Sequence, residues 1–181
     1  MRTGDIAPDF RLPDHLGNVR SLSKLLVDGP VVLFFYPAAT SPVCTAEACH
    51  FRDLGGAFES FSAQRVGIST DTTGKQSHFA LQRSFDYPML ADTDGAVAEQ
   101  FGVRRGGPLA RLRRRKDIGR GRSHSARSSM NSTRFSMIRQ LLSVKRTTFV
   151  IDTNQVVRLV VRSERSHVHA DKALDYLRYL S

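Results

Sequence analysis

The chain of 181 residues has no tryptophan, only two cysteines and no long uninterrupted apolar run. A membrane-spanning helix needs about 18 to 20 consecutive apolar residues, so we expect no transmembrane segment. The amino end, Met1 to Asp5, leads into no signal-peptide core. Two cysteines are also too few for the disulfide framework of a small secreted domain. These absences predict a cytoplasmic protein. The length of 181 residues is within the range of one domain, so we expect a single domain over residues 1–181.

The two cysteines, Cys44 and Cys49, are five residues apart. This spacing excludes the C-x-x-C site of a dithiol reductase. It also excludes a zinc site built from paired C-x-x-C motifs, because no second cluster follows. We expect that the protein needs no metal, and the resemblance described below implies no haem or flavin either.

The residues before Cys44 predict a strand that leads into a helix. Val31 to Tyr36 is an apolar run typical of a buried strand, and Pro37 ends it. Ser41 is a suitable N-cap, with Pro42 at the first helical position. Cys44 then lies in the first turn, where free backbone N–H groups and the helix dipole favour thiolate over thiol. The segment therefore predicts a nucleophilic sulfur.

The distance to Cys49 predicts a conformational change. Five helical steps separate two Cα atoms by roughly 8.5 Å and about 140° around the axis. Disulfides usually need less than about 6.8 Å between Cα atoms. If both cysteines lie on one helix, a Cys44–Cys49 bond requires that helix to unwind in part. Cys49 is alternatively a small core residue, a structural disulfide is a further alternative, and Ser41 is alternatively no more than a cap.

The rest of the chain alternates between strands and helices. A short hairpin is predicted at residues 9–12 and 19–22, and a second one at residues 147–151 and 156–161. Further strands are predicted at 65–69 and 87–90, and helices at 42–61, 74–85, 96–101 and 170–180. This order indicates an α/β fold.

Two separated motifs resemble one family. The pattern Pro37-x-x-x-Ser41-x-x-Cys44 is similar to the peroxidatic-cysteine motif of peroxiredoxins, and the run from Cys44 to Cys49 resembles their Q-type, bacterioferritin comigratory subgroup. Residues 144–152 are similar to the segment that carries the active-site arginine of that subgroup. The resemblance covers nearly the whole chain except residues 104–143. It implies a thioredoxin-like fold, in which a central mixed sheet is flanked by helices. Val43 departs from the pattern, since the subgroup commonly has glycine there.

The resemblance also implies an activity, thiol-dependent reduction of hydrogen peroxide and small organic hydroperoxides. Cys44 would attack the peroxide, Ser41 and Arg146 would hold it, and Pro37 would shape the loop and exclude water. Cys49 would then resolve the sulfenic acid at Cys44 as an intramolecular disulfide. Thioredoxin or a similar dithiol would reduce that disulfide. For Arg146 the alternative is a solvated charge at the end of a strand.

Positive charge is concentrated in one segment. Residues 104–143 hold twelve of the 27 lysines and arginines but one of the 17 acidic residues, so they carry +11 while the remainder sums to −1. We expect a basic, disordered insertion rich in Arg, Gly and Ser, with a short helix at 135–142. Its charge suits contact with a polyanion such as nucleic acid or an acidic membrane surface. Two other interpretations of this segment remain: it is an insertion that binds no partner, or it is an autoregulatory segment that covers the active site.

Two other functions remain open from the sequence. One is a non-catalytic, degenerate thioredoxin-like module whose basic segment binds nucleic acid. The other is a peroxide-sensing redox relay that passes oxidising equivalents from Cys44 to a partner. Consumption of peroxide with a thioredoxin system distinguishes the enzyme from the binding module.

Overall fold

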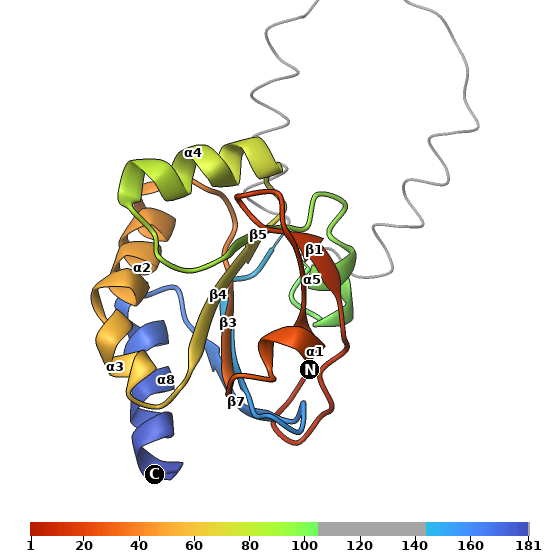
Figure 1. The fold of residues 1–181 in the computed structure, drawn as a ribbon, viewed down its shortest axis with the longest axis vertical. Helices are drawn as coiled ribbons and strands as arrows, with labels where there is room; N and C mark the ends of the chain where they lie inside the picture. The colour runs from red at the N-terminus through yellow and green to blue at the C-terminus, as the bar shows by residue number, and fades with distance from the viewer. Residues whose placement is uncertain (105–143, 181) are drawn as a thin grey trace, which may run out of the picture.

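A mixed five-stranded sheet forms the centre of the molecule in a computed structural model that describes residues 1–104 and 144–180 (Figure 1). The strand order is β5-β4-β3-β6-β7. The strands are β3 (Val31–Phe35), β4 (Gln64–Ser69), β5 (Met89–Ala91), β6 (Thr147–Ile151) and β7 (Val157–Arg162). β3, β4 and β5 are parallel, whereas β6 runs antiparallel to β3 and to β7. The expected mixed sheet is therefore confirmed.

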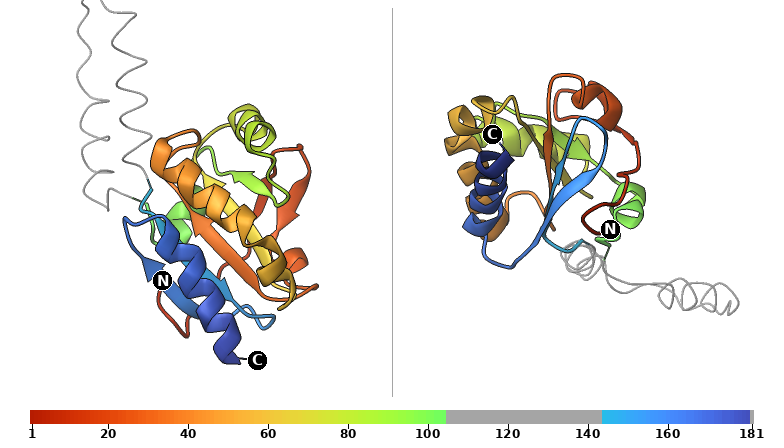
Figure 2. Two further views of the ribbon diagram at one scale, coloured as in Figure 1. Left: turned by 90° about the vertical axis from the view of Figure 1, so that its left-hand side faces the viewer. Right: turned by 90° about the horizontal axis from the view of Figure 1, so that it is seen from below.

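Helices cover both faces of this sheet, and a small hairpin of β1 (Arg11–Pro13) and β2 (Val19–Ser21) adds to one of them. The helices are α1 (Leu22–Leu25), α2 (Pro42–Asp53), α3 (Gly55–Glu59), α4 (Thr73–Arg83), α5 (Ala96–Gln100) and α8 (His167–Leu180). Figure 2 shows α2 and α8 side by side on one face of the sheet, and these two helices are in contact. Among the described residues, no helix is both long and apolar enough to cross a membrane.

The side chains of β3 alternate between two hydrophobic cores. Val31, Leu33 and Phe35 belong to the core shared with the hairpin, α1 and α5. Val32 and Phe34 belong to the core shared with α2, α3, α4 and α8. All five are fully buried, because the strand is central and both of its faces are covered. The α2 and α8 face is the one on which Cys44 lies.

The predicted helix over residues 42–61 is wrong in its length, since it is two helices that meet at Leu54. Two consecutive glycines follow, and each lowers helix propensity by about 1 kcal/mol relative to alanine. Gly55 also packs against a buried arginine, because a Cβ at this position would lie 2.8 Å from Arg65 Nη1. The small residue that weakens the helix thus makes room for a guanidinium group.

Other boundaries also differ from the sequence prediction, among them those of the last helix, of β5 and of the first hairpin. The last helix begins at His167 and not at residue 170. The strand predicted at 87–90 is β5, shifted to Met89–Ala91. Leu22, predicted to end a strand, instead begins α1, because the Ser21 hydroxyl accepts a hydrogen bond from the backbone N–H of Lys24 and caps a helix.

The two residues that flank the undescribed segment lie next to each other. Arg104 and Val144 form an antiparallel bridge, and the backbone N–H of Lys145 donates to the carbonyl of Val103 at 2.7 Å. The predicted helix at 135–142 and, apart from Arg104, the predicted insertion lie outside the described residues. The segment therefore leaves and rejoins the fold at one place.

Candidate active site

Cys44 lies in the first turn of α2, as predicted. Ser41 is the N-cap, its hydroxyl accepts a hydrogen bond from the Cys44 backbone N–H at 3.3 Å, and Pro42 is the first helical residue. The thiol is buried, with 2% of the residue exposed. Val43 is 48% exposed, so its side chain lies largely outside the buried site. The local signals in the sequence are sufficient to place the sulfur.

Arg146 reaches the sulfur because of the register between two antiparallel strands. Thr147 pairs with Phe35 at the end of β3, so Arg146 lies at the level where β3 leads into the Cys44 loop. Its Nη2 donates to Cys44 Sγ at 3.3 Å, and only 6% of the residue is exposed. The alternative of a solvated strand-end charge is therefore wrong. The guanidinium group is thus placed to interact with negative charge on the sulfur.

Glu47 completes a buried ion cluster that the sequence reasoning missed. It is fully buried one turn after Cys44, and its Oε2 accepts a hydrogen bond from Arg146 Nη1. Burial raises its pKa from 4.5 to about 8, although the nearby guanidinium of Arg146 acts in the opposite direction. The helical period places positions 44, 47, 48 and 51 on one face of α2, and all four are buried. Because Glu47 is the only charged residue on this apolar face, the periodicity could have identified it as a buried carboxylate.

The loop between β3 and α2 is held by a buried carboxylate. Asp71 Oδ2 accepts from the backbone N–H of Ala39 at 2.6 Å and from the Ser69 hydroxyl at 3.0 Å. Lys75 Nζ donates to the other carboxylate oxygen at 3.3 Å. Pro37, at the start of this loop, is half-buried. The loop that presents Ser41 and Cys44 is therefore anchored to the segment that follows β4.

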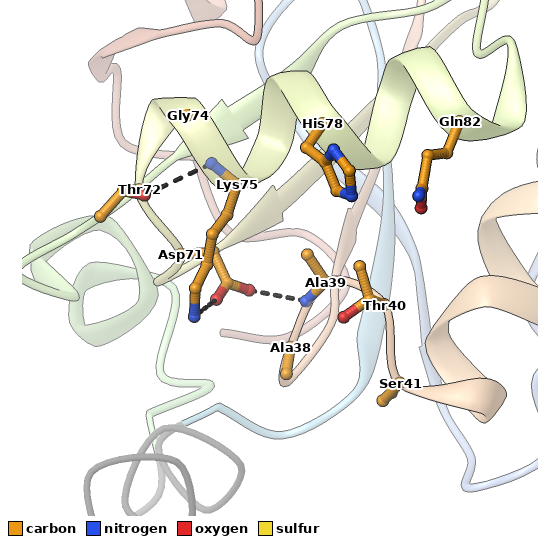
Figure 3. Close-up of a pocket in the computed structure, with 10 residues that line it drawn as sticks. All are labelled: Ala38, Ala39, Thr40, Ser41, Asp71, Thr72, Gly74, Lys75, His78 and Gln82. Atoms are coloured by element: carbon orange, nitrogen blue, oxygen red, sulfur yellow. Dashed lines mark hydrogen bonds and ion pairs between the residues drawn. The ribbon is translucent and has the colours of Figure 1, made fainter. Parts of the chain in front are cut away.

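A cavity of about 830 Å³ borders this loop (Figure 3). Lys75, His78 and Gln82 project from α4 toward the loop across the cavity. Its lining includes Ser41 but neither Cys44 nor Arg146. The cavity thus lies beside the sulfur site and shares one wall with it.

Cys49 is on the same uninterrupted helix as Cys44, and both are free thiols. It is partly buried and packs against the core on this face of the sheet. Because α2 is intact from Pro42 to Asp53, a bond between the two sulfurs requires part of this helix to unwind.

Two further buried polar residues behind Glu47 were not predicted. His169 of α8 is fully buried, and its Nδ1 lies 2.8 Å from Thr148 Oγ1 and 3.7 Å from Glu47 Oε1. Thr148 of β6 points to the same side as Arg146, which directly precedes this strand, because side chains two residues apart in an extended chain point to the same side. The sequence offered no signal for His169, because the last helix was predicted to begin at residue 170 and α8 begins at His167.

Comparison with known proteins identifies the family of the chain. The family model described as AhpC/TSA family matches residues 3–160. A putative peroxiredoxin of Mycobacterium tuberculosis is 51% identical over 179 residues, which cover 98% of this chain and 97% of the relative. Peroxiredoxin Bcp of Escherichia coli is 40% identical over 103 residues, or 57% of this chain and 65% of the relative.

Solved structures show the same fold. The crystal structure of peroxidoxin BcpB from Mycobacterium tuberculosis superposes with a TM-score of 0.79 at 50% identity and covers 100% of this chain and 99% of the other. A peroxiredoxin Q from Xanthomonas campestris has a TM-score of 0.71 at 23% identity, covering 95% and 92% of the two chains. The chain therefore belongs to the AhpC/TSA family and is a peroxiredoxin of the Q type, the bacterioferritin comigratory group.

Proposed function

We propose that this peroxiredoxin, a thiol-dependent peroxidase, uses Cys44 as its nucleophile and Arg146 as the cation that assists it. The observation that supports this most directly is the 3.3 Å hydrogen bond from Arg146 Nη2 to Cys44 Sγ, made inside a buried site by residues 102 positions apart. A buried thiolate needs a fixed positive partner, and a guanidinium group supplies one that is always charged.

The first half of the cycle oxidises the sulfur. The Cys44 thiolate attacks one oxygen of the hydroperoxide, so an S–O bond forms while the O–O bond breaks. The departing oxygen leaves as an alkoxide or hydroxide and takes up a proton, and the two electrons lost by sulfur reduce the peroxide. Arg146 Nε is buried without a hydrogen-bond partner among the described residues, so it is a spare donor for a peroxide oxygen.

Ser41 and Pro37 assist this step from the loop between β3 and α2. The Ser41 oxygen accepts from the Cys44 backbone, which leaves its own O–H free to donate to the peroxide. Pro37 is half-buried beside the strand end, where it limits the access of water. Asp71 keeps the loop in place through the Ala39 N–H.

The second half of the cycle uses Cys49. Its thiol condenses with the Cys44 sulfenic acid, so an S–S bond forms and water leaves. Part of α2 must unwind for this step, because both sulfurs are on the intact helix. An external dithiol then reduces the disulfide, and family membership supports thioredoxin or a similar protein in this role.

Two single substitutions test these roles. Cys44→Ser should abolish peroxide consumption in the presence of a thioredoxin system. Cys49→Ser should consume one equivalent of peroxide and then stop, with mass spectrometry showing a sulfenic acid at Cys44. Turnover that persists in Cys44→Ser would contradict the nucleophile, and unchanged turnover in Cys49→Ser would contradict the resolving thiol. Failure of the wild-type protein to turn over with any dithiol would favour the redox-relay alternative.

Three other predictions stay predictions: a single domain over residues 1–181, a cytoplasmic location, and contact of the basic segment with a polyanion. The nucleic-acid alternative depends on residues 105–143, which lie outside the described part of the chain. Its test is salt-dependent retention on DNA, compared between the full chain and a variant without residues 106–134.

A further inference from the structure

The ring of His169 is held in one orientation behind the ion cluster. Its Nε2 lies 2.9 Å from the carbonyl oxygen of Ser163. A carbonyl oxygen can only accept, so Nε2 carries a hydrogen in this arrangement. Nδ1 is then the nitrogen whose protonation can change.

Nδ1 accepts a hydrogen bond from the Thr148 hydroxyl at 2.8 Å, and it also faces a carboxylate oxygen that lacks a donor. When Nδ1 is protonated, the hydroxyl turns and accepts from it instead. Glu47 Oε2 accepts from Arg146, whereas Oε1 has no hydrogen-bond partner among the described residues and lies 3.7 Å from Nδ1. This separation is longer than a hydrogen bond, so in this geometry the two groups interact electrostatically. A buried carboxylate oxygen without a donor loses the free energy of its hydration and gains no hydrogen bond in return. A proton at Oε1, the oxygen that faces His169, removes this unfavourable term.

The charges of the cluster require one such proton. With Cys44 as thiolate and Glu47 as carboxylate, the single cation Arg146 leaves one uncompensated negative charge in a buried site. A proton on Glu47 or on His169 neutralises it. Burial raises the pKa of Glu47 to about 8 and lowers that of His169, so near neutral pH the proton is held on the Glu47 side.

Other charged groups around the pair act on it more weakly. Glu164, before α8, favours the protonated form of both Glu47 and His169. Lys172 of α8 opposes a charge on His169, as Arg146 does. From β6 the neighbour is the uncharged Thr148, and from α2 it is Cys44.

We propose that His169 is a positioning residue of the peroxidase site, acting through one proton that it shares with Glu47. This rests on the proposed role of Cys44. While the pair holds the proton, Glu47 is neutral and the whole charge of Arg146 serves the sulfur and the departing oxygen. When the proton leaves, two anions compete for one guanidinium group. The rate of Cys44 oxidation therefore falls on the alkaline side.

The main experiment is the pH profile of Cys44 oxidation by hydrogen peroxide, followed by rapid quenching, alkylation and mass spectrometry. His169→Gln keeps a donor for the Ser163 carbonyl but replaces the basic ring nitrogen by a weakly basic amide. We expect the pKa that controls the alkaline fall in rate to move down by about one unit, which is about a fivefold lower rate at pH 8 and little change at pH 6. His167→Gln, an exposed histidine on the same helix, is the matched control and should follow the wild type.

Two outcomes of this experiment overturn the proposal. If His169→Gln follows the wild-type profile, His169 only anchors α8. If the rate of Cys44 oxidation in Glu47→Gln still falls at alkaline pH, the titration of another group causes that fall. The shared proton is supported if the alkaline fall in rate is absent from Glu47→Gln and occurs at lower pH in His169→Gln.

A measurement on the wild-type protein covers the case in which His169→Gln fails to fold. Infrared difference spectra of the reduced protein between pH 7 and pH 9.5 should show the loss of one protonated carboxyl band, and Glu47→Gln should lack this band. Its absence from the wild type overturns the proposal. The band does not depend on turnover, so it distinguishes failure of the shared proton from failure of Cys44 as the nucleophile.

Discussion

At the scale of single residues, the site is a row of buried groups that depend on one another. Arg146 donates both to the sulfur of Cys44 and to the carboxylate of Glu47. Glu47 in turn faces His169. Burying any one of these groups alone would carry a large desolvation free energy. The neighbouring group offsets it by supplying the opposite charge or a proton. Substitutions here are therefore expected to change both rate and pH dependence.

Arg146→Ala should slow the oxidation of Cys44 by about 10² to 10³, the usual cost of removing one donor to a developing anion. The fold should persist, because Glu47 can remain protonated when its partner is gone. The second-order rate constant with hydrogen peroxide measures the effect. Arg158→Ala is the matched control, since Arg158 pairs with Asp152 on the exposed side of the β6–β7 hairpin. An unchanged rate in Arg146→Ala would make Arg146 a structural residue.

The raised pKa of Glu47 predicts a pH dependence of stability. Its pKa of about 8 in the fold lies above the ordinary value of 4.5, so the folded state binds this proton more tightly than the unfolded state. The resulting stabilisation is complete below about pH 4.5 and is lost as the pH rises through 8, at a slope of at most about 1.4 kcal/mol per pH unit.

Denaturant unfolding of wild type and Glu47→Gln between pH 5 and pH 9 measures this loss. The wild type should lose more free energy of unfolding than the variant over this range. Glu59→Gln serves as the control, because this carboxylate is exposed on α3. Equal pH slopes in wild type and Glu47→Gln would show that Glu47 is already ionised in the fold.

At the scale of secondary-structure elements, the proposed cycle requires α2 to be intact in one step and partly unwound in the next. An intact first turn keeps Cys44 at the capped helix end, whereas disulfide formation needs the helix to open between the two sulfurs. Two side chains hold the middle of this helix. Tyr87 donates to the carbonyl of Ala48 at 2.7 Å, and His50 Nε2 lies 2.7 Å from Asp171 Oδ1 of α8. These contacts are expected to set how readily α2 unwinds.

Tyr87→Phe should speed disulfide formation while leaving the peroxide step unchanged. The substitution keeps the ring that packs against Phe34 but removes the bond to Ala48. A net contribution of about 0.5 to 1.5 kcal/mol per hydrogen bond corresponds to about a two- to tenfold faster step. The appearance of the disulfide after one equivalent of peroxide gives the rate. Tyr179→Phe, on the exposed end of α8, should have no effect. A slower step in Tyr87→Phe would mean that the tether assists the change.

At the scale of the whole molecule, the basic segment leaves and rejoins the fold at adjacent residues. Arg104 and Val144 are paired, so the sheet and its two cores are complete on either side of this point. The +11 charge of residues 104–143 contrasts with −1 for the remainder. The net positive charge of the protein is therefore carried by a part of the chain that contains none of its proposed catalytic groups.

Deleting residues 106–134 should leave the core folded. Arg104 and Val144, which lie on either side of the shortened segment, are already paired, and shortening a loop between fixed ends changes the closure free energy only slowly with length. Thermal unfolding of the deletion variant is compared with a variant in which a Gly/Ser segment of the same length replaces these residues. A large fall in the unfolding temperature of both variants would show that the segment stabilises the fold.

Sequence alone determined the strand before Cys44, the cap at Ser41, the position of the thiol and the α/β order of elements. These features follow from signals that act over a few residues, such as capping, proline placement and apolar periodicity. The place of Arg146 was inferred from family resemblance and not from any local pattern. The break at Leu54 was missed although the two glycines that follow it are visible in the sequence, whereas the packing of Arg65 of β4 against Gly55 is a tertiary contact that no local pattern shows.

Tertiary structure decided the meeting of Arg146, Glu47 and His169. Thr147 pairs with Phe35, so the register of β6 on β3 carries Arg146 to the sulfur, and the packing of α8 beside α2 carries His169 to Glu47. A charge is stable inside a protein only where distant elements supply its partner. The partner depends on which strands and helices become neighbours, and no short stretch of this chain contains that information.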